Sequence, residues 1–253
     1  MATTNTETKL SPEIPNTEKE RAIKAVTEFL GKLKEDEPTS QQDLMNLFES
    51  LSALTGAVPA YAGDLYTFLI NKPEYQASDS RRALVRRMRE ALVKNVSVQG
   101  VCRPLEAVFA IEALERPEDQ DFSCSREHWK AGPDNRARGE KWLNTIYQGN
   151  LSTTTDRFLA HKDFDFISRE ITYGLYLSDH SILDPVATEL VTLTGIMIQN
   201  LPLETAWHLR GTRRVGVSIE DVELVQQCVK MVADFGFVSQ SKVPRVTDIE
   251  HEV

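Results

Sequence analysis

The sequence lacks the short motifs by which most cofactor and metal sites are recognised. Its 253 residues contain no CxxC, no HExxH, no GxGxxG and no Walker loop, so we expect neither a metal nor a bound cofactor. It contains only three cysteines, which are widely spaced and odd in number. That pattern argues against a disulfide framework and indicates a reducing compartment, for which we expect the cytoplasm.

Long apolar runs and an excess of positive charge are also missing. The first 20 residues contain no apolar segment of the kind found in secretory signals. The longest nearly apolar run, ELVTLTGIMI, is far shorter than the ~20 residues that span a bilayer. The net charge of −9 gives no electrostatic reason to expect a nucleic acid or an anionic membrane as partner.

What the sequence does contain is helical periodicity. A stripe from Ala22 to Leu33 repeats apolar residues at helical steps, and no segment shows the sustained alternation of a β-strand. We predict an all-α chain with a disordered tail over 1–16, one domain over 17–238 and a C-terminal tail over 239–253. Helices are predicted over 40–51, 60–71, 79–95, 102–114, 137–149, 163–176, 185–199, 202–215 and 218–235.

Residues 115–136 interrupt this pattern. The segment holds two prolines and many charges and has no clear period, so we predict a loop or insertion of roughly 20 residues. A loop of that length is uncommon in a compact domain and is often functional. His128 and Trp129 in the loop, with Trp142 after it, are candidates for a lid.

Two parts of the chain have the same form, a long helix, a short break and a second helix. They are ALVRRMREALVKNVSVQGVCRPLEAV and ELVTLTGIMIQNLPLETAWHLRGTRR. When Leu84 is set against Leu190, Cys102 falls opposite His208. The identity between the parts is very low, so the repeat is a hypothesis from shape. It would imply duplicated halves, over about 17–115 and 137–238.

The stretch NLPLETAWHLRGTRRVG places three functional residue types on one helix just after a proline. Glu204 and His208 are four positions apart, so they lie on one face, with Trp207 beside them. Histidine can move a proton in either direction near neutral pH, and a neighbouring carboxylate can fix its tautomer. Such a set suits general acid–base catalysis on a carbon or oxygen acid.

A structural interpretation of the same residues remains open. The helix dipole alone favours a glutamate in a first turn, and Glu–His pairs four apart are common on exposed helices. Glu189 lies near the start of the preceding helix, about three turns from the break. If the two helices form a hairpin, the packing angle decides whether Glu189 approaches His208.

The segment ELVTLTGIMIQNLPLETAWHLRGTRRVGVSIEDVELV resembles the carboxymuconolactone decarboxylase and alkylhydroperoxidase D-like family. Members have a glutamate that opens an apolar helix, a break, a helix with a histidine, a glycine and an acidic-capped helix. Glu189, His208 and Gly216 match this pattern, most clearly over 185–235 and more weakly over 79–114. The resemblance implies an all-α fold of two related halves, like that of longer fungal members, and a homo-oligomer without a metal or organic cofactor.

Departures from the family pattern favour one chemistry within it. Peroxidase members carry a CxxC before the histidine, and the matching positions here are Leu201 and Glu204, which cannot form a thiolate or a disulfide. Decarboxylase members also lack the cysteines and place a glutamate four residues before the histidine. The resemblance therefore implies that Glu204 and His208 are an acid–base pair, with Glu189 as a further catalytic candidate.

These observations lead us to expect a cofactor-independent lyase or isomerase that acts on a small oxygenated metabolite, with a place in fungal secondary metabolism. Trp207, Arg103, Cys102 and Trp142 are candidates for substrate binding. Arg103 could clamp a substrate carboxylate, and a nearby arginine would hold an oxyanion. Two alternatives stay open. One is a thiol-dependent redox protein that uses Cys102, and the other is a non-catalytic binding or scaffold protein with a decayed site.

Overall fold

The computed structural model describes residues 50–253. The prediction of an all-α fold is confirmed, since these residues form helices and no strand. The predicted tail over 1–16 and the stripe from Ala22 to Leu33 lie outside the described residues, as does most of the predicted helix over 40–51. None of the described helices is long and apolar enough to cross a membrane.

The first half of the described chain contains a helix over 50–57 and three longer elements. They are α3 (Ala62–Ile70), α4 (Ser78–Gln99) and α5 (Cys102–Glu112). The second half contains α6 (Pro133–Tyr147), α7 (Leu151–Thr155), α8 (Lys162–Phe166), the π-helix η6 (Ile167–Leu177), α9 (Pro185–Met197), α10 (Pro202–Arg214), α11 (Ile219–Phe235) and α12 (Val246–Ile249). Short 3-10 helices are η1 (Pro59–Tyr61), η2 (Pro73–Tyr75), η3 (Pro117–Asp119), η4 (Gln148–Asn150), η5 (Asp156–Phe158) and η7 (Glu250–Glu252).

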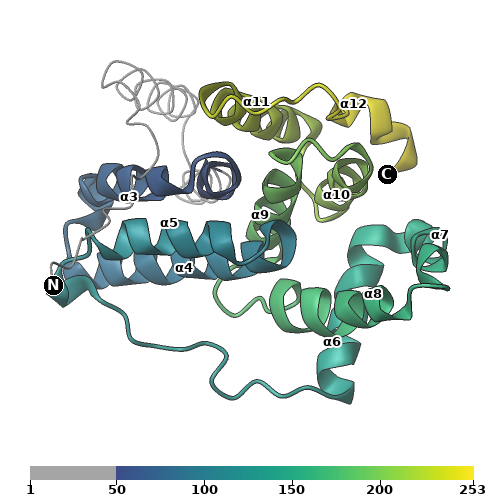
Figure 1. Ribbon diagram of the computed structural model, residues 1–253, viewed down its shortest axis with the longest axis horizontal. Helices are drawn as coiled ribbons and strands as arrows, with labels where there is room; N and C mark the ends of the chain where they lie inside the picture. Colours follow the sequence, from purple (N-terminus) through teal and green to yellow (C-terminus); the bar gives the residue numbers. More distant parts are fainter. Residues whose placement is uncertain (1–49) are drawn as a thin grey trace, which may run out of the picture.

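Helix α9 is the central element of the fold. It lies between α4 and α10, and every residue from Ala187 to Met197 is buried (Figure 1). Asp184 begins it as the sequence predicts, because the Ala187 amide donates to the Asp184 carboxylate at 2.8 Å and a proline follows at the first helical position. Any charged residue on α9 is therefore enclosed by protein on all sides.

The break after α9 reverses the chain, so that α10 packs back against α9. Asn200 has a φ of +59° in the break, and Pro202 opens α10. Gly216, with a φ of +100°, lies in the turn that follows α10. The Ser218 hydroxyl then accepts a hydrogen bond from the Asp221 amide and caps the start of α11. The predicted boundaries of these helices agree with the observed ones to within two residues. The two helices that carry Glu189 and His208 form a hairpin.

The proposed internal repeat has a different register from the one we expected. Both parts are helical hairpins, with Gly100 at one break and Asn200 at the other. Cys102 is the first residue of α5, whereas His208 lies in the middle of α10, so the expected pairing of these two residues is wrong. Apolar residues recur every three or four positions along a helix, so a sequence pattern tolerates a slip of one turn.

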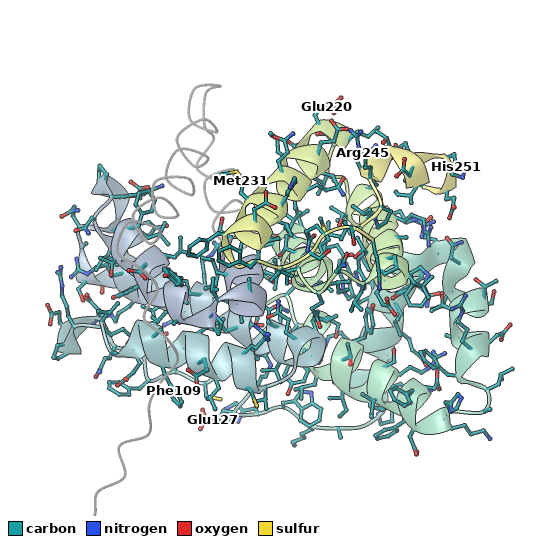
Figure 2. The ribbon with its side chains drawn as sticks, turned by 45° about the horizontal axis from the view of Figure 1, so that its top comes forward. Phe109, Glu127, Glu220, Met231, Arg245 and His251 are labelled. Atoms are coloured by element: carbon teal, nitrogen blue, oxygen red, sulfur yellow. The ribbon has the colours of Figure 1, made fainter. Side chains whose placement is uncertain are left out.

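The segment over 239–253 belongs to the packed structure and is not a loose tail. Val246 and Ile249 on α12 are buried, and Arg213 on α10 makes an ion pair with Glu250 at 2.8 Å. Figure 1 shows α12 beside α10, and Figure 2 shows Arg245 and His251 on this last part of the ribbon. Only two residues of the segment are buried, and that is too few for a helical period to be recognised.

The predicted loop between α5 and α6 runs along α4 and is held there by ion pairs. Arg81 Nε lies 2.6 Å from Asp119 Oδ2, and Arg86 Nε lies 2.6 Å from Asp121 Oδ2. Among the loop residues only η3 is helical, apart from turns. The charges that obscured a helical period in this segment thus serve to fix the loop on the surface of α4.

Candidate functional site

The α9–α10 hairpin brings Glu189 and His208 together although they are 19 positions apart. Glu189 Oε1 lies 2.7 Å from His208 Nδ1, and the two residues are 0% and 4% exposed. One proton is shared between these two atoms, either on the ring nitrogen or on the carboxyl oxygen. Burial raises the pKa of Glu189, and the contact with His208 opposes that shift.

Gly211 makes the close approach of the two helices possible. A Cβ at this position would lie 2.6 Å from Glu189 Oε1 and 2.6 Å from Ile146 Cγ2. Gly211 follows His208 by three residues, so it lies on the same face of α10. The glycine therefore provides the space into which the Glu189 carboxylate fits.

Two tyrosines extend the pair on the far side of the imidazole. The Tyr173 hydroxyl lies 3.4 Å from His208 Nε2 and donates to the Tyr147 hydroxyl at 3.1 Å. Because a hydroxyl carries one hydrogen, His208 Nε2 is the donor to Tyr173 in this arrangement. Burial raises the pKa of both tyrosines, to well above the ordinary value for Tyr173, so both hydroxyls are neutral.

Tyr173 reaches His208 from the π-helix η6. The Ser178 amide donates to the Tyr173 carbonyl at 3.0 Å, five residues back, which is the hydrogen bond of a π-helix. Gly174 and Gly139 let η6 and α6 approach closely, since a Cβ at Gly139 would lie 2.9 Å from the Gly174 Cα. Such segments are rare and occur frequently at functional sites.

Glu204 does not make the contact that the sequence suggested. Within residues 50–253 it has no hydrogen bond or ion pair, and the ring nitrogens of His208 face Glu189 and Tyr173 instead. The carboxylate that orients His208 is therefore that of Glu189 and not, as we expected, that of Glu204. Glu204 is half-buried, and its charge contributes to the raised pKa of Tyr147, which places it near the outer end of the chain of hydroxyls.

Trp207 and Trp142 both belong to the aromatic cluster that surrounds the hydrogen-bonded residues His208, Tyr173 and Tyr147. The Trp207 ring lies edge-on to Tyr147, with centroids 5.9 Å apart, and the Arg157 guanidinium lies over the Trp207 ring, 5.9 Å from its centroid. Trp142 is buried in the same cluster and packs edge-on against His180 at 4.6 Å. Trp142 therefore forms part of the interior rather than a lid over the site.

Arg103 and Cys102 lie away from the histidine. Arg103 donates to the Gly56 carbonyl, and Cys102 is a free, exposed thiol at the start of α5. The structure brings neither of them to His208, so it does not support the expected role of Arg103 in clamping a substrate carboxylate at this histidine. Within the described part of the chain, no group of three His, Cys, Asp or Glu side chains gathers as a metal site would require.

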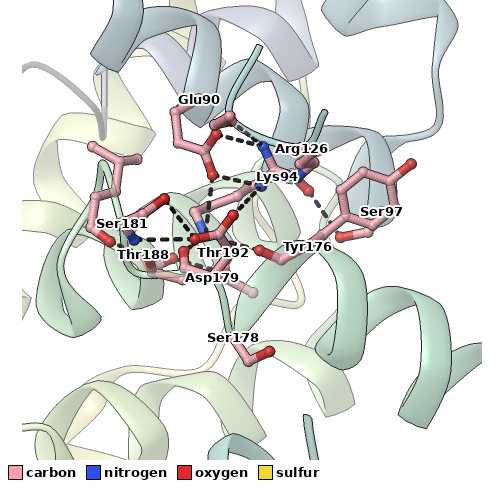
Figure 3. Close-up of polar contacts among 12 residues, drawn as sticks. Glu90, Lys94, Ser97, Arg126, Tyr176, Ser178, Asp179, Ser181, Thr188 and Thr192 are labelled. Carbon is pink, nitrogen blue, oxygen red and sulfur yellow. Dashed lines mark hydrogen bonds and ion pairs between the residues drawn. The ribbon is translucent and has the colours of Figure 1, made fainter. Parts of the chain in front are cut away.

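A second buried polar cluster lies where α4, the long loop and the end of η6 meet (Figure 3). Lys94, which is 0% exposed, donates to the Tyr176 and Asp179 carbonyls at 2.8 and 2.6 Å and lies 3.4 Å from Glu90 Oε1. Arg126 contacts both Glu90 oxygens at 2.7 Å. Desolvation lowers the pKa of Lys94 to about 8.

Reasoning from the sequence missed Tyr147 and Tyr173. They come from α6 and η6, far from His208 along the chain. An aromatic residue at a buried helical position most often only packs in the hydrophobic core. One indirect signal was present, because Gly139 and Gly174 interrupt two helical patterns in which glycine is unfavourable. Such a glycine suggests a close approach of two backbones.

The chain shows little similarity to known proteins. A scan against the models of known families finds no match, and no solved structure matches. Among curated proteins, it is similar to a Schizosaccharomyces pombe protein named Peroxisomal protein 2, with 24% identity over 139 residues. The similar stretch covers 54% of this chain and 63% of that protein, which is less than two thirds of its length. An identity this low does not assign the chain to a family.

Proposed function

We propose that the chain is a cofactor-independent lyase or isomerase that moves protons on a small oxygenated metabolite. The observation that carries the proposal is the enclosed Glu189–His208 pair, with 2.7 Å between Oε1 and Nδ1. His208 takes up or releases the proton, and Glu189 holds the imidazole in one orientation. The resemblance to the carboxymuconolactone decarboxylase family implies the same chemistry, with Glu189 in the role that we expected of Glu204.

The neutral hydroxyls beside His208 support this chemistry. Proton abstraction next to a carbonyl group leaves negative charge on oxygen, and a positioned hydroxyl stabilises that charge in a water-poor site. Tyr173 and Tyr147 supply hydroxyls of this kind and are 4% and 6% exposed. They take the place of the arginine that we expected to hold an oxyanion.

The two alternative functions have less support. The thiol-dependent alternative needs a base near Cys102, and within residues 50–253 its sulfur has no hydrogen-bond partner. The scaffold alternative predicts that the Glu189–His208 pair contributes only to stability. An assay of proton transfer by the purified chain distinguishes the scaffold from the enzyme.

The cellular compartment, the metabolic role and the oligomeric state of the protein stay predictions. The cytoplasm and a role in fungal secondary metabolism follow from the cysteine pattern and the family resemblance, as does the homo-oligomer. The name of the Schizosaccharomyces pombe relative makes the peroxisome the competing location. Microscopy of the tagged chain against markers of both compartments distinguishes them.

The test is a search for proton transfer by the purified full chain. Small β-keto acids and lactone acids, including 4-carboxymuconolactone, are incubated with it in D₂O and followed by NMR for exchange of C–H protons and loss of CO₂. On a compound that the wild type converts, we expect His208→Ala to lower kcat roughly 10²–10⁴-fold. The control is His161→Ala, at an exposed position. Wild-type turnover by His208→Ala would refute the proposal, and no conversion of any compound by the wild type would favour the scaffold.

A further inference from the structure

The hydrogen bonds beyond His208 form a continuous chain through the interior. Glu189, His208, Tyr173 and Tyr147 are joined in that order by contacts of 2.7, 3.4 and 3.1 Å. Each is contributed by a different helix, namely α9, α10, η6 and α6. Of these contacts the one between Nε2 and Tyr173 is long, as catalytic hydrogen bonds often are before a substrate binds.

At the Tyr147 end of this hydrogen-bonded chain, the hydroxyl group has an unused hydrogen. Tyr147 accepts the hydrogen of Tyr173, and no acceptor within residues 50–253 takes the hydrogen of Tyr147 itself. At the inner end, Glu189 Oε2 is buried without a hydrogen-bond partner among the described residues. An unused donor in an enclosed site is costly unless another group binds it.

The surroundings of Tyr147 show where the chain leads. Trp207 packs edge-on against the Tyr147 ring, and both Trp207 and Glu204 are half-buried on the first two turns of α10. His208 and Tyr173 are each 4% exposed, and Tyr147 is 6% exposed. The Tyr147 ring thus packs against Trp207, on the half-exposed part of α10 that also carries Glu204.

We propose that Tyr173 and Tyr147 extend the Glu189–His208 pair into a proton relay, and that the Tyr147 hydroxyl is the group that meets the substrate oxygen. The relay rests on the proposed acid–base function and adds two residues to it. The substrate that fits is one whose oxygen gains negative charge during the reaction, such as an enolisable carbonyl compound, because a neutral hydroxyl donor stabilises that charge.

The transfer balances without any redox partner. The Tyr147 O–H bond breaks as the substrate oxygen takes the proton, Tyr147 takes the proton of Tyr173, and Tyr173 takes the Nε2 proton of His208. The imidazolium becomes a neutral imidazole that still donates from Nδ1 to the Glu189 carboxylate. The reverse sequence returns the proton from the substrate to the ring, so no electrons are gained or lost.

The relay is tested on the full chain by NMR of ¹⁵N-labelled histidine, with His208 assigned from a His208→Gln variant. We expect Tyr173→Phe to shift the Nε2 resonance of His208. We expect Tyr147→Phe to shift it in the same direction by less, and the double variant to match Tyr173→Phe, because Tyr147 acts through Tyr173. Tyr66→Phe, at a buried hydroxyl without a partner among the described residues, should leave the resonance unchanged.

The outcomes separate the relay from the function. If Tyr147→Phe is folded, as judged by its amide spectrum, and leaves Nε2 unmoved or adds to Tyr173→Phe independently, the relay is refuted. On a converted compound, Tyr147→Phe should lower kcat by about 10²-fold with little change in KM. Wild-type kcat in that variant refutes the substrate-facing role while the function stands. No conversion by the wild type refutes the function, and the substrate-facing role with it.

Discussion

The two buried polar clusters of this protein each contain a glutamate but differ in how completely their polar groups are paired. Around Lys94, the ammonium contacts three acceptors and both Glu90 oxygens are engaged, which leaves only Arg126 Nε without a partner. Around His208, the chain of contacts has an unused carboxylate oxygen at Glu189 and an unused hydroxyl hydrogen at Tyr147. A fully paired cluster holds helices together. A chain with an unused acceptor at one end and an unused donor at the other allows a proton to pass along it.

The π-helix η6 takes part in both clusters. Its Tyr173 side chain reaches His208, and its Tyr176 carbonyl accepts from Lys94 at 2.8 Å. Lys94 also binds the Asp179 carbonyl just after η6. The Lys94 cluster thus fixes the end of the helix that presents Tyr173, so the structural cluster supports the position of the chemical one.

The largest expected effect is on stability, from Glu90→Gln. Removing this carboxylate leaves Lys94 and Arg126 buried without their shared counter-charge, and breaking a buried ion pair in this way costs about 3–5 kcal/mol. Urea denaturation should show that loss. The control Glu140→Gln, whose side chain is 38% exposed beside Arg136, should cost no more than about 1 kcal/mol. Equal losses in the two variants would contradict the distinction between the clusters.

The next effect is on the pH dependence of stability. The pKa of Lys94 is lowered to about 8 in the fold, from 10.5. Between these values the unfolded chain binds the proton and the folded chain does not, so the free energy of unfolding rises with pH. We expect the wild type to gain up to roughly 3 kcal/mol relative to Lys94→Met from pH 8 to 10.5. A constant difference between the two proteins across that range would exclude a desolvated ammonium.

A smaller effect is expected from Gly211→Ala. The new methyl group would lie 2.6 Å from Glu189 Oε1, and overpacking of this kind costs about 1–3 kcal/mol. Displacement of the carboxylate should also lower turnover per folded molecule. Gly149→Ala is the matched control, because a Cβ there meets nothing within 4 Å. If Gly211→Ala keeps full activity, the fit of Glu189 against α10 has no functional importance.

The helices around the site could be predicted because local signals mark them. Asp184 and Ser218 cap their helices through side-chain hydrogen bonds, and Pro202 and Gly216 mark the ends of α10. Caps and breaks act within a few residues, so a sequence displays them directly.

The contacts within the site depend on packing between distant helices, which local patterns do not encode. The sequence placed Glu204 one turn from His208, yet the carboxylate that binds the ring comes from α9. Tyr147 and Tyr173 arrive from two further helices, and the π-helical turn that aims Tyr173 breaks the helical period assumed in reading the sequence. The sequence pointed to His208 and offered Glu189 as a candidate, but the contact between them and the two tyrosines depended on how the helices pack.

The most direct test of the Glu189–His208 pair compares Glu189→Gln with Glu204→Gln on a compound that the wild type converts. Both changes keep the shape of the side chain and remove its charge. We expect Glu189→Gln to remain folded and to lose about 10²-fold or more in kcat, because the amide lacks the negative charge that stabilises the protonated imidazole. Glu204→Gln should stay within about tenfold of the wild type, because this carboxylate does not touch the ring. Wild-type turnover by Glu189→Gln, or a larger loss in Glu204→Gln, would contradict the pairing of Glu189 with His208 as the catalytic centre.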